Sequence, residues 1–424
     1  MKKKVHLGIF GLGTVGTGVV ELLLKRKQMV GDCQVVLEKV AVRHKRKKRA
    51  VSLPSSLLTT SPEDILRDPK IDTVIEVMGG VNPAREIILE ALRRRKNVVT
   101  ANKALLARAG SEIFKEAMEN DCYLGVRASN IASYRLIESL SFSPSRISKL
   151  VGVFNGTCNY ILTEMERKEE DFSTVLGRAQ KMGYTERDPS DDVDGYDTAH
   201  KLIVLLGLSL GYFPPLGSIL VEGIRNISPL DVIFARELGY RIKLLAIAKI
   251  QGNDLEARVH PALLPRDRGL ARLEGIENGI ELRDEVGLEI GMQAPGAGKY
   301  PTATAILEDL ICVARGRKLA FPSDKKKLSL RGMGRIETQY YLRLSALDEA
   351  GVLGKISCVL GEHGISIKSV LQKGRDEKKR KSVPLIMLTH EAREENLQKA
   401  LKRMEKLPVV KEKPVLMRVE EGIF

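Results

Sequence analysis

The sequence has few aromatic residues, no long apolar run and no closely spaced cysteine pair. Only 4% of its 424 residues are aromatic and no recognised nucleic-acid motif accompanies its basic runs, so we expect no nucleic-acid partner despite a net charge of +15. No stretch approaches the roughly 18 apolar residues of a membrane span, so we expect no membrane partner. The five cysteines contain no C-x-x-C pair, which argues against a disulfide framework and a zinc site, and we expect no metal.

The basic excess has two interpretations. It is either a solvated Lys/Arg surface or a positive field that attracts anionic substrates and phosphates. The start of the chain is basic and then apolar, but it is glycine-punctuated and lacks a small-residue cleavage site. Together with the scattered cysteines, this predicts a cytoplasmic protein.

A chain of this length predicts two or three domains. In the first 130 residues, apolar strand-like runs alternate with helical spacing, which indicates a parallel sheet covered by helices. The expected strands are 5–10, 35–42, 73–77, 97–100 and 123–126, and the expected helices are 15–27, 62–67, 83–96 and 104–119.

Beyond this region the pattern changes twice. Residues 131–301 predict a mixed α+β domain with strands at 147–154 and 242–250 and a helix at 198–210. Helical spacing returns at 302–315, and we expect 302–322 to fold back onto the first domain. After a basic linker at 323–337, residues 338–424 show the β-α-β-β-α-β order of a ferredoxin-like unit. The fold class is therefore α/β, with a Rossmann-type domain, a mixed domain and a ferredoxin-like domain.

A glycine fingerprint follows the first expected strand. Gly11, Gly13 and Gly16, with Thr14 and Val15 between them, form G-x-G-x-x-G where a strand meets a helix. In that context the glycines allow a tight turn, close approach of a pyrophosphate and helix packing. The motif predicts dinucleotide binding; the alternative is a merely structural turn.

The end of the second long strand predicts which cofactor binds. An acidic residue there would bind the ribose 2′-hydroxyl of NAD, but this strand ends at Arg43, and five further Lys and Arg residues lie within 45–49. A cationic site suits the 2′-phosphate of NADP, so we expect NADP, with NAD as the alternative. A solvated basic loop would give the same pattern.

Two more loops follow strands of the expected sheet. Gly79 lies in Val77–Gly80, and Thr100 and Lys103 lie in Val99–Lys103. Ligands bind open parallel sheets at the carboxyl edge, where both loops are expected. Lys103 is therefore a candidate site residue rather than an ordinary surface lysine.

Residues 183–201, GYTERDPSDDVDGYDTAHK, are rich in carboxylates. They are compatible with an acidic helix-capping loop. However, Asp197 and Lys201 are four residues apart on an expected helix that continues as the apolar run 202–206, so they share one face of a buried helix. A lysine held by a carboxylate in such a site can donate a proton to a carbonyl oxygen while hydride reaches the carbon.

Asn155-Gly156-Thr157-Cys158-Asn159-Tyr160 follows an expected strand. Its backbone amides and small polar side chains suit a binding loop, or it is only a turn. We do not expect Cys158 to be a nucleophile, because no histidine lies near it in the sequence.

In this order and spacing, GLGTVG, VMGG, VTANKALLA, NGTCNYIL, GYTERDPSDDVDGYDTAHK and PGAGKYPTATA resemble homoserine dehydrogenase over essentially the whole chain. The tail, with DEAGVL at 348–353 and HGISIKSVLQ at 363–372, resembles the ACT domain of bacterial members of that family. The resemblance implies interconversion of L-homoserine and L-aspartate 4-semialdehyde with NAD(P)H, in threonine, isoleucine and methionine synthesis. We also expect an amino-acid effector at the ACT domain, and a homodimer or homotetramer.

The resemblance also implies residue roles. Lys201 is the proton donor, Asp197 orients it or holds substrate, and Lys103 lies between cofactor and substrate. The substrate's amino group would bind Glu186. The resemblance assigns the lining of the substrate pocket to Tyr184, Gly156, Thr157 and Asp192. It assigns contacts with the cofactor to Gly183, Gly298 and Thr302.

One segment departs from the family pattern. Where an E-A-S-V-G-G-G-I-P pattern is usual, residues 127–135 read RASNIASYR, so the family's monovalent-cation site is in doubt. Arg127 either supplies a fixed positive charge in place of the cation, or points to solvent and leaves the loop misshapen. The segment therefore leaves open a second function: a catalytically weakened sensor that binds NADP and an amino acid.

Overall fold

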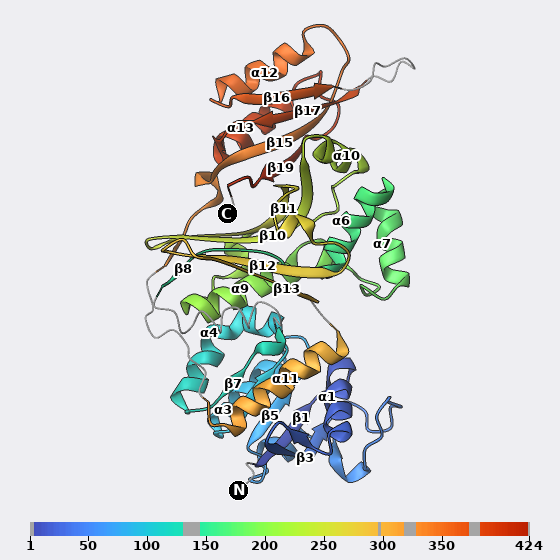
Figure 1. Cartoon of the computed structure of the whole chain (residues 1–424), viewed down its shortest axis with the longest axis vertical. Helices are drawn as coiled ribbons and strands as arrows, with labels where there is room; N and C mark the ends of the chain where they lie inside the picture. The colour runs from blue at the N-terminus through green and yellow to red at the C-terminus, as the bar shows by residue number, and fades with distance from the viewer. Residues whose placement is uncertain (1–3, 130–144, 296–297, 318–327, 373–381, 423–424) are drawn as a thin grey trace. The chain divides into compact units, whose positions relative to one another are not determined.

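The computed structural model describes residues 4–129, 145–295, 298–317, 328–372 and 382–422. They form two compact units (Figure 1). Unit 1 comprises Met1–Arg146, Ala199–Ser218 and Met292–Lys327, and unit 2 comprises Ile147–Thr198, Ile219–Gly291 and Leu328–Phe424. Six residues of the altered segment, 130–135, lie outside the described part of the chain.

Unit 1 is built on a mainly parallel sheet in the order β2-β3-β1-β5-β6-β7, with β4 beside β3. Its strands are β1 (Lys4–Phe10), β2 (Met29–Val30), β3 (Cys33–Ala41), β4 (Leu58–Thr59), β5 (Thr73–Glu76), β6 (Asn97–Thr100) and β7 (Leu124–Gly125). Because β3 and β5 flank β1 on opposite sides, the chain reverses its winding direction there, at the edge where open α/β sheets bind ligands.

The helices of unit 1 lie near expected ranges, but one of them, α9, was expected in the domain 131–301. They are α1 (Thr14–Lys25), α2 (Glu63–Leu66), α3 (Ala84–Arg93), α4 (Lys103–Glu119), α9 (Tyr196–Leu210, whose first residues belong to unit 2) and α11 (Lys299–Ala314), with the 3-10 turns η1 (Ser55–Leu57), η2 (Arg127–Ser129) and η3 (Leu216–Ser218). Helix α11 packs beside α1 (Figure 1), and both contribute to the core around β1 and β3.

Unit 2 contains one 12-stranded sheet. Its first part comprises β8 (Ile147–Val153), β9 (Leu220–Val221), β10 (Tyr240–Gln251), β11 (Asp254–Pro265), β12 (Glu277–Asp284), β13 (Glu289–Pro295) and β14 (Ser329–Leu330). Strands β10 and β11 form a long hairpin with full register from Tyr240↔Pro265 to Gln251↔Asp254, closed by Gly252, whose positive φ permits the two-residue turn. Helices α6 (Gly156–Lys168), α7 (Phe172–Lys181), α8 (Ser190–Val193) and α10 (Pro229–Glu237) and the turn η4 (Leu270–Arg272) complete this part.

The C-terminal part has the expected β-α-β-β-α-β order, with one short additional strand, β18, before its second helix. It comprises η5 (Met333–Arg335), β15 (Glu337–Ala346), α12 (Val352–Glu362), β16 (Ile367–Gln372), β17 (Val383–Thr389), β18 (Ala392–Arg393), α13 (Glu394–Met404) and β19 (Val415–Val419). Helices α12 and α13 bury their apolar faces against these strands. The last strand, β19, pairs with both β15 and β11, so the C-terminal strands continue the sheet of the preceding part.

Candidate functional site

The fingerprint loop shows why its positions are glycine. Gly11 has φ +104°, and a Cβ there would lie 2.7 Å from the Val77 carbonyl oxygen; a Cβ at Gly16 would lie 2.2 Å from the Gly11 oxygen. Among the described residues, no atom outside Gly13 and its two chain neighbours lies within 4 Å of a Cβ built on Gly13. The loop is thus tightly packed at Gly11 and Gly16 but open at Gly13. This arrangement fits the pyrophosphate of a dinucleotide beside the first turn of α1, which includes Thr14 and Val15.

The loops after β5 and β6 are tied together beside it. The Thr100 hydroxyl donates to Glu76 Oε2 (2.7 Å), and the Met78 amide donates to Glu76 Oε1 (2.8 Å). Asn102 caps α4 by accepting from the Leu105 amide (3.1 Å), and its Nδ2 donates to the Gly80 carbonyl (2.6 Å). Both loops follow parallel neighbouring strands, so they lie at one edge of the sheet.

The two loops contain three predicted residues, Thr100, Gly79 and Lys103, and are joined by one that was missed. Gly79 has φ +72° in the first loop, and Lys103 is half-buried as the first residue of α4. Glu76, fully buried, was not predicted, because only the folded structure shows that its carboxylate joins two loops. Burial raises the pKa of Glu76, although its hydrogen bonds from Thr100 and from Met78 oppose the rise.

The start of α11 lies against α1. A Cβ on Gly18 would lie 2.9 Å from Lys299 Cγ and 3.3 Å from Ala303 Cβ, so the two helices approach closely. Lys299 Nζ pairs with Glu21 at 2.6 Å. Gly298 and Thr302, the predicted cofactor-covering residues, are the N-cap and part of the first turn of α11.

Arg43 is exposed, two residues beyond the end of β3. The loop after it is folded by Arg49, which donates to the carbonyls of His44 (2.7 Å) and Lys47 (2.9 Å). The structure thus places a cationic loop after the strand that ends beside β1.

In unit 2, Asn155 joins the acidic segment to α6. Its Oδ1 accepts from the Cys158 amide (2.8 Å) and caps α6, while its Nδ2 donates to Asp192 Oδ1 (2.7 Å) and Asp197 Oδ2 (2.9 Å). Thr185 donates to the other oxygen of Asp192 (2.8 Å). Asn155 was absent from the predicted site set, and the segment that it starts is a helix N-terminus rather than a loop or turn.

The other predicted substrate residues lie close to this cluster. Thr157 donates to the Tyr184 carbonyl (2.9 Å), and the Tyr184 ring lies edge-on to Tyr160 at 4.9 Å between centroids. Gly156 lies so near the chain that a Cβ there would be 2.7 Å from the Ile276 oxygen. Gly183, assigned to cofactor binding, adopts φ +74° directly before Tyr184. Glu186 is exposed.

Asp197 and Lys201 lie one turn apart on α9, as predicted, and both are buried. Residues 202–206, which follow them on the helix, are apolar and also buried, so this stretch of α9 is enclosed on all sides. A lysine and a carboxylate that share one face of a buried helix are suited to acid–base chemistry.

Lys243 of β10 contacts α6 and was not among the predicted site residues. Its Nζ donates to Asn159 Oδ1 (2.7 Å) and to the Leu273 carbonyl. Burial lowers the pKa of Lys243 to about 7. Asn159 belongs to the NGTCNY segment, so this contact fixes the helix that carries Gly156 and Thr157.

Arg127 is buried and does not point to solvent. Its Nη1 lies 2.5 Å from Asp309 Oδ1 of α11 and 2.8 Å from the Tyr123 hydroxyl, and its amide donates to Asp309 Oδ2 (3.1 Å). The guanidinium therefore pairs with a carboxylate within unit 1. This contradicts the solvent-pointing alternative.

In the C-terminal part, Gln372 Nε2 donates to Asp348 Oδ1 (3.1 Å). Gly351, the N-cap of α12, has φ +85°, and in the described part of the chain no atom beyond its two neighbours lies within 4 Å of a Cβ built there. The two segments of the ACT-like pattern thus meet at the start of α12.

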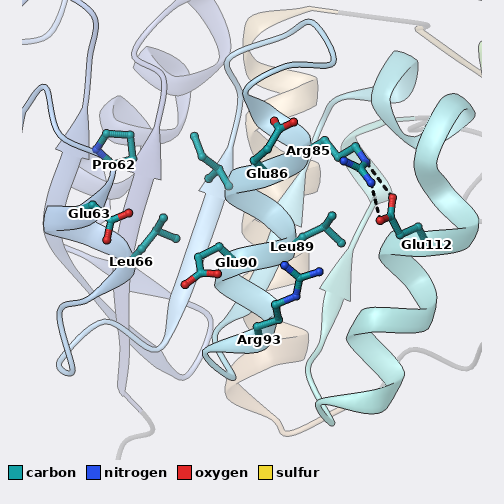
Figure 2. A pocket seen from close by; sticks show the side chains of 10 residues that line it. Pro62, Glu63, Leu66, Arg85, Glu86, Leu89, Glu90, Arg93 and Glu112 are labelled. Atoms are coloured by element: carbon teal, nitrogen blue, oxygen red, sulfur yellow. Dashed lines mark hydrogen bonds and ion pairs between the residues drawn. The ribbon is translucent and has the colours of Figure 1, made fainter.

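A hollow of about 430 Å³ lies elsewhere on unit 1, between α2, α3 and α4 (Figure 2). Arg85 spans it to Glu112 with bonds of 2.8 and 2.6 Å, and none of the predicted site residues lines it. Over the described ranges, no cluster of three or more His, Cys, Asp or Glu is arranged for a metal. Nor does any helix in that part of the chain have the length and apolarity needed to span a bilayer.

Three family models match the chain: the homoserine dehydrogenase NAD-binding domain at 11–127, homoserine dehydrogenase at 134–311 and the ACT domain at 340–409. The homoserine dehydrogenase of Bacillus subtilis is 37% identical over 432 residues, covering 99% of both chains. That of Synechocystis is 37% identical, covering 98% of this chain and 99% of the relative.

Solved structures agree. A homoserine dehydrogenase from Thiobacillus denitrificans superposes with a TM-score of 0.89 at 36% identity, covering 99% of both chains. That of S. aureus at pH 7.5 gives 0.78 at 27% identity, covering all of both chains. Fold, loops and matches define a nicotinamide-dependent oxidoreductase that acts on a CH–OH group and carries an ACT domain. More particularly, the chain belongs to the homoserine dehydrogenase family.

Proposed function

We propose that this protein interconverts L-homoserine and L-aspartate 4-semialdehyde, prefers NADP over NAD, and serves threonine, isoleucine and methionine synthesis. The observation that carries the proposal is the Asn155–Asp192–Asp197 cluster, because it fixes the family's acidic segment directly before Lys201. Cofactor binding is assigned to residues 1–130 with 302–322. Substrate binding, catalysis and dimerisation are assigned to 131–301, and regulation to 338–424.

The chain's own residues have distinct tasks in this proposal. Glu186 holds the substrate ammonium, and Asp197 orients Lys201. During oxidation Lys201 takes the proton from the substrate hydroxyl, and during reduction it returns that proton to the carbonyl oxygen. Lys103 stabilises negative charge on that oxygen. A bound nicotinamide supplies hydride transfer.

The direct test is absorbance at 340 nm with L-homoserine and each cofactor. We expect reduction of NADP⁺ at a higher kcat/KM than NAD⁺, and loss of activity in Lys201→Ala. Failure of both cofactors to react, with NADP still bound in calorimetry, would favour the sensor function left open by residues 127–135.

We further propose that the ACT domain binds a small amino acid near Asp348, Gly351 and Gln372, with threonine the first to test. The support is the Gln372–Asp348 hydrogen bond at the open start of α12. We propose a homodimer or homotetramer, which light scattering coupled to size-exclusion chromatography tests.

A further inference from the structure

Strand β19 joins the ACT part of the sheet to the substrate part. Arg418 on this strand stands opposite Tyr340 of β15 on one side and Ala262 of β11 on the other. Its backbone therefore belongs to both parts of the sheet, so the residues that its side chain binds are held where the two parts meet.

The Arg418 side chain is buried and holds two carboxylates. It donates to both oxygens of Glu394, the first residue of α13, at 3.0 and 2.6 Å. Its Nη1 also donates to Glu222 Oε2 at 2.6 Å, and Nη2 lies 3.4 Å from Glu222 Oε1. Only 1% of the Arg418 side chain is exposed, against 38% for Glu222. Such charge-assisted bonds are the stronger class of hydrogen bond.

Glu222 begins a four-residue segment that holds the acidic loop. The Ile224 amide donates to the Val193 carbonyl at 2.8 Å. A Cβ at Gly223 would lie 2.2 Å from that same carbonyl oxygen, so the two backbones are in direct contact. Arg225 pairs with Asp194, including a bond of 3.1 Å from Nη2.

The loop held in this way carries Asp192. Its carboxylate receives hydrogen bonds from Asn155 and Thr185, and its carbonyl lies 3.2 Å from Cys158 Sγ. Asp194 and Ser190, on either side of it, are both contacted by Arg225. The four-residue segment 222–225 therefore connects Arg418 of the ACT part to the helical turn that contains Asp192.

We propose that Arg418 and Glu222 are positioning residues for the substrate loop: the ACT domain's last strand holds residues 190–194 in their binding geometry through the segment 222–225. This inference rests on the proposed function only in assigning that loop to homoserine. The proposed link itself concerns only how firmly residues 190–194 are held, whatever ligand they bind.

Glu222→Ala tests the link without endangering the fold, because Arg418 keeps its bidentate partner Glu394. We expect faster hydrogen–deuterium exchange in peptides covering 185–195 of the full-length protein without substrate, and unchanged exchange in α1 and α4. The KM for homoserine should rise by about three- to tenfold, the scale of one ordinary hydrogen bond, because Glu222 is partly exposed to solvent. The KM for NADP⁺ and kcat should stay within about twofold, since positioning mainly affects binding.

Two matched variants complete the test. Glu222→Gln can still accept from Arg418 and should restore most of the exchange protection and the KM. Glu337→Ala removes another ion pair of the ACT part, to Arg393, whose side chains are both more than half exposed; it should change neither readout. Unchanged exchange at 185–195 in Glu222→Ala, or the same increase in Glu337→Ala, would overturn the proposal. If homoserine proves not to be a substrate, the exchange result still decides the link.

Discussion

Replacing Arg127 with methionine probes a buried ion pair at the end of the parallel sheet. The side chains of Arg127 and Asp309 are 7% and 0% exposed, and they meet at 2.5 Å. Removing one partner of such a pair leaves the other charge buried and costs about 3–5 kcal/mol. Methionine keeps the length of the side chain, so packing changes little. We expect Arg127→Met to lower the free energy of unfolding of unit 1 by that amount at pH 8.

The loss should depend on pH. Burial raises the pKa of Asp309 to about 6, and Arg127 and Tyr123 only partly oppose this rise. In the folded protein the Asp309 carboxyl therefore keeps its proton up to about pH 6, whereas in the unfolded chain it releases the proton near pH 4. This difference stabilises the folded state below about pH 4, and the stabilisation is lost as the pH rises through 6. At 1.36 kcal/mol per unit, it amounts to about 3 kcal/mol. Without the guanidinium the pKa of Asp309 rises further, so the deficit of the variant should grow between pH 6 and pH 8.

Calorimetric unfolding at pH 5, 7 and 8 measures the free energy of unfolding. Because a chain of two units need not unfold in one step, hydrogen exchange in peptides 123–129 and 303–312 shows whether the loss of stability lies in unit 1. Arg85→Met is the control: the side chains of Arg85 and Glu112 are 38% and 43% exposed, so its cost should be under about 1 kcal/mol. Arg127→Met combined with Asp309→Asn should cost less than the sum of the single changes. Strict additivity, or a deficit independent of pH, would refute the reasoning.

Four further predictions concern function. Arg43→Asp should flatten or reverse the NADP preference, and an unchanged ratio of kcat/KM for the two cofactors would count against a 2′-phosphate site. Lys201→Ala should lower kcat by about 10²-fold or more while NADP binding persists, whereas Glu186→Ala should raise the KM for homoserine; near-normal activity in both would contradict the assigned roles. Isothermal titration should detect an amino acid that binds the full chain but not Gln372→Ala, and no binding in a panel would leave the ACT domain as an oligomerisation element. Activity should not respond to Na⁺ or K⁺ at constant ionic strength, because Arg127 replaces the Glu of the family pattern to which the resemblance assigns the cation; Arg127→Glu should lose activity that either ion partly restores.

Local patterns were enough to predict most elements of the fold. Strands β1, β3, β5 and β6 and the helix α4 begin and end within a few residues of the expected ranges, because their apolar periodicity and flanking turns are strong. The ferredoxin-like order of 338–424 was also confirmed. Short edge strands such as β4 and β9 were not predicted, since a two-residue strand carries no periodicity and depends on its partner.

The candidate site was predictable only in part. Fingerprint glycines and the acidic segment stand out because each is local in sequence. Glu76, Asn155 and Lys243 act across the chain: Asn155 meets Asp197 42 residues away, and Lys243 meets Asn159 84 residues away. Their partners become neighbours only after the sheets form, so no local spacing marks them. For Arg127, the sequence left two orientations open, and the carboxylate of Asp309 selects the buried one.

The junction between the substrate part and the ACT part combines a shared sheet with buried arginines. Besides Arg418, Arg258 of β11 pairs with Glu420 just after β19, and Arg343 of β15 pairs with Asp231 of α10 at 2.7 Å. Buried ion pairs add little net stability, but a misplaced one leaves a charge without a partner. A shift of β19 by one residue would turn Arg418 to the opposite face of the sheet and separate it from both carboxylates. These pairs therefore favour a single register, and a fixed register is what lets one strand of the ACT part determine the position of a loop in the substrate part.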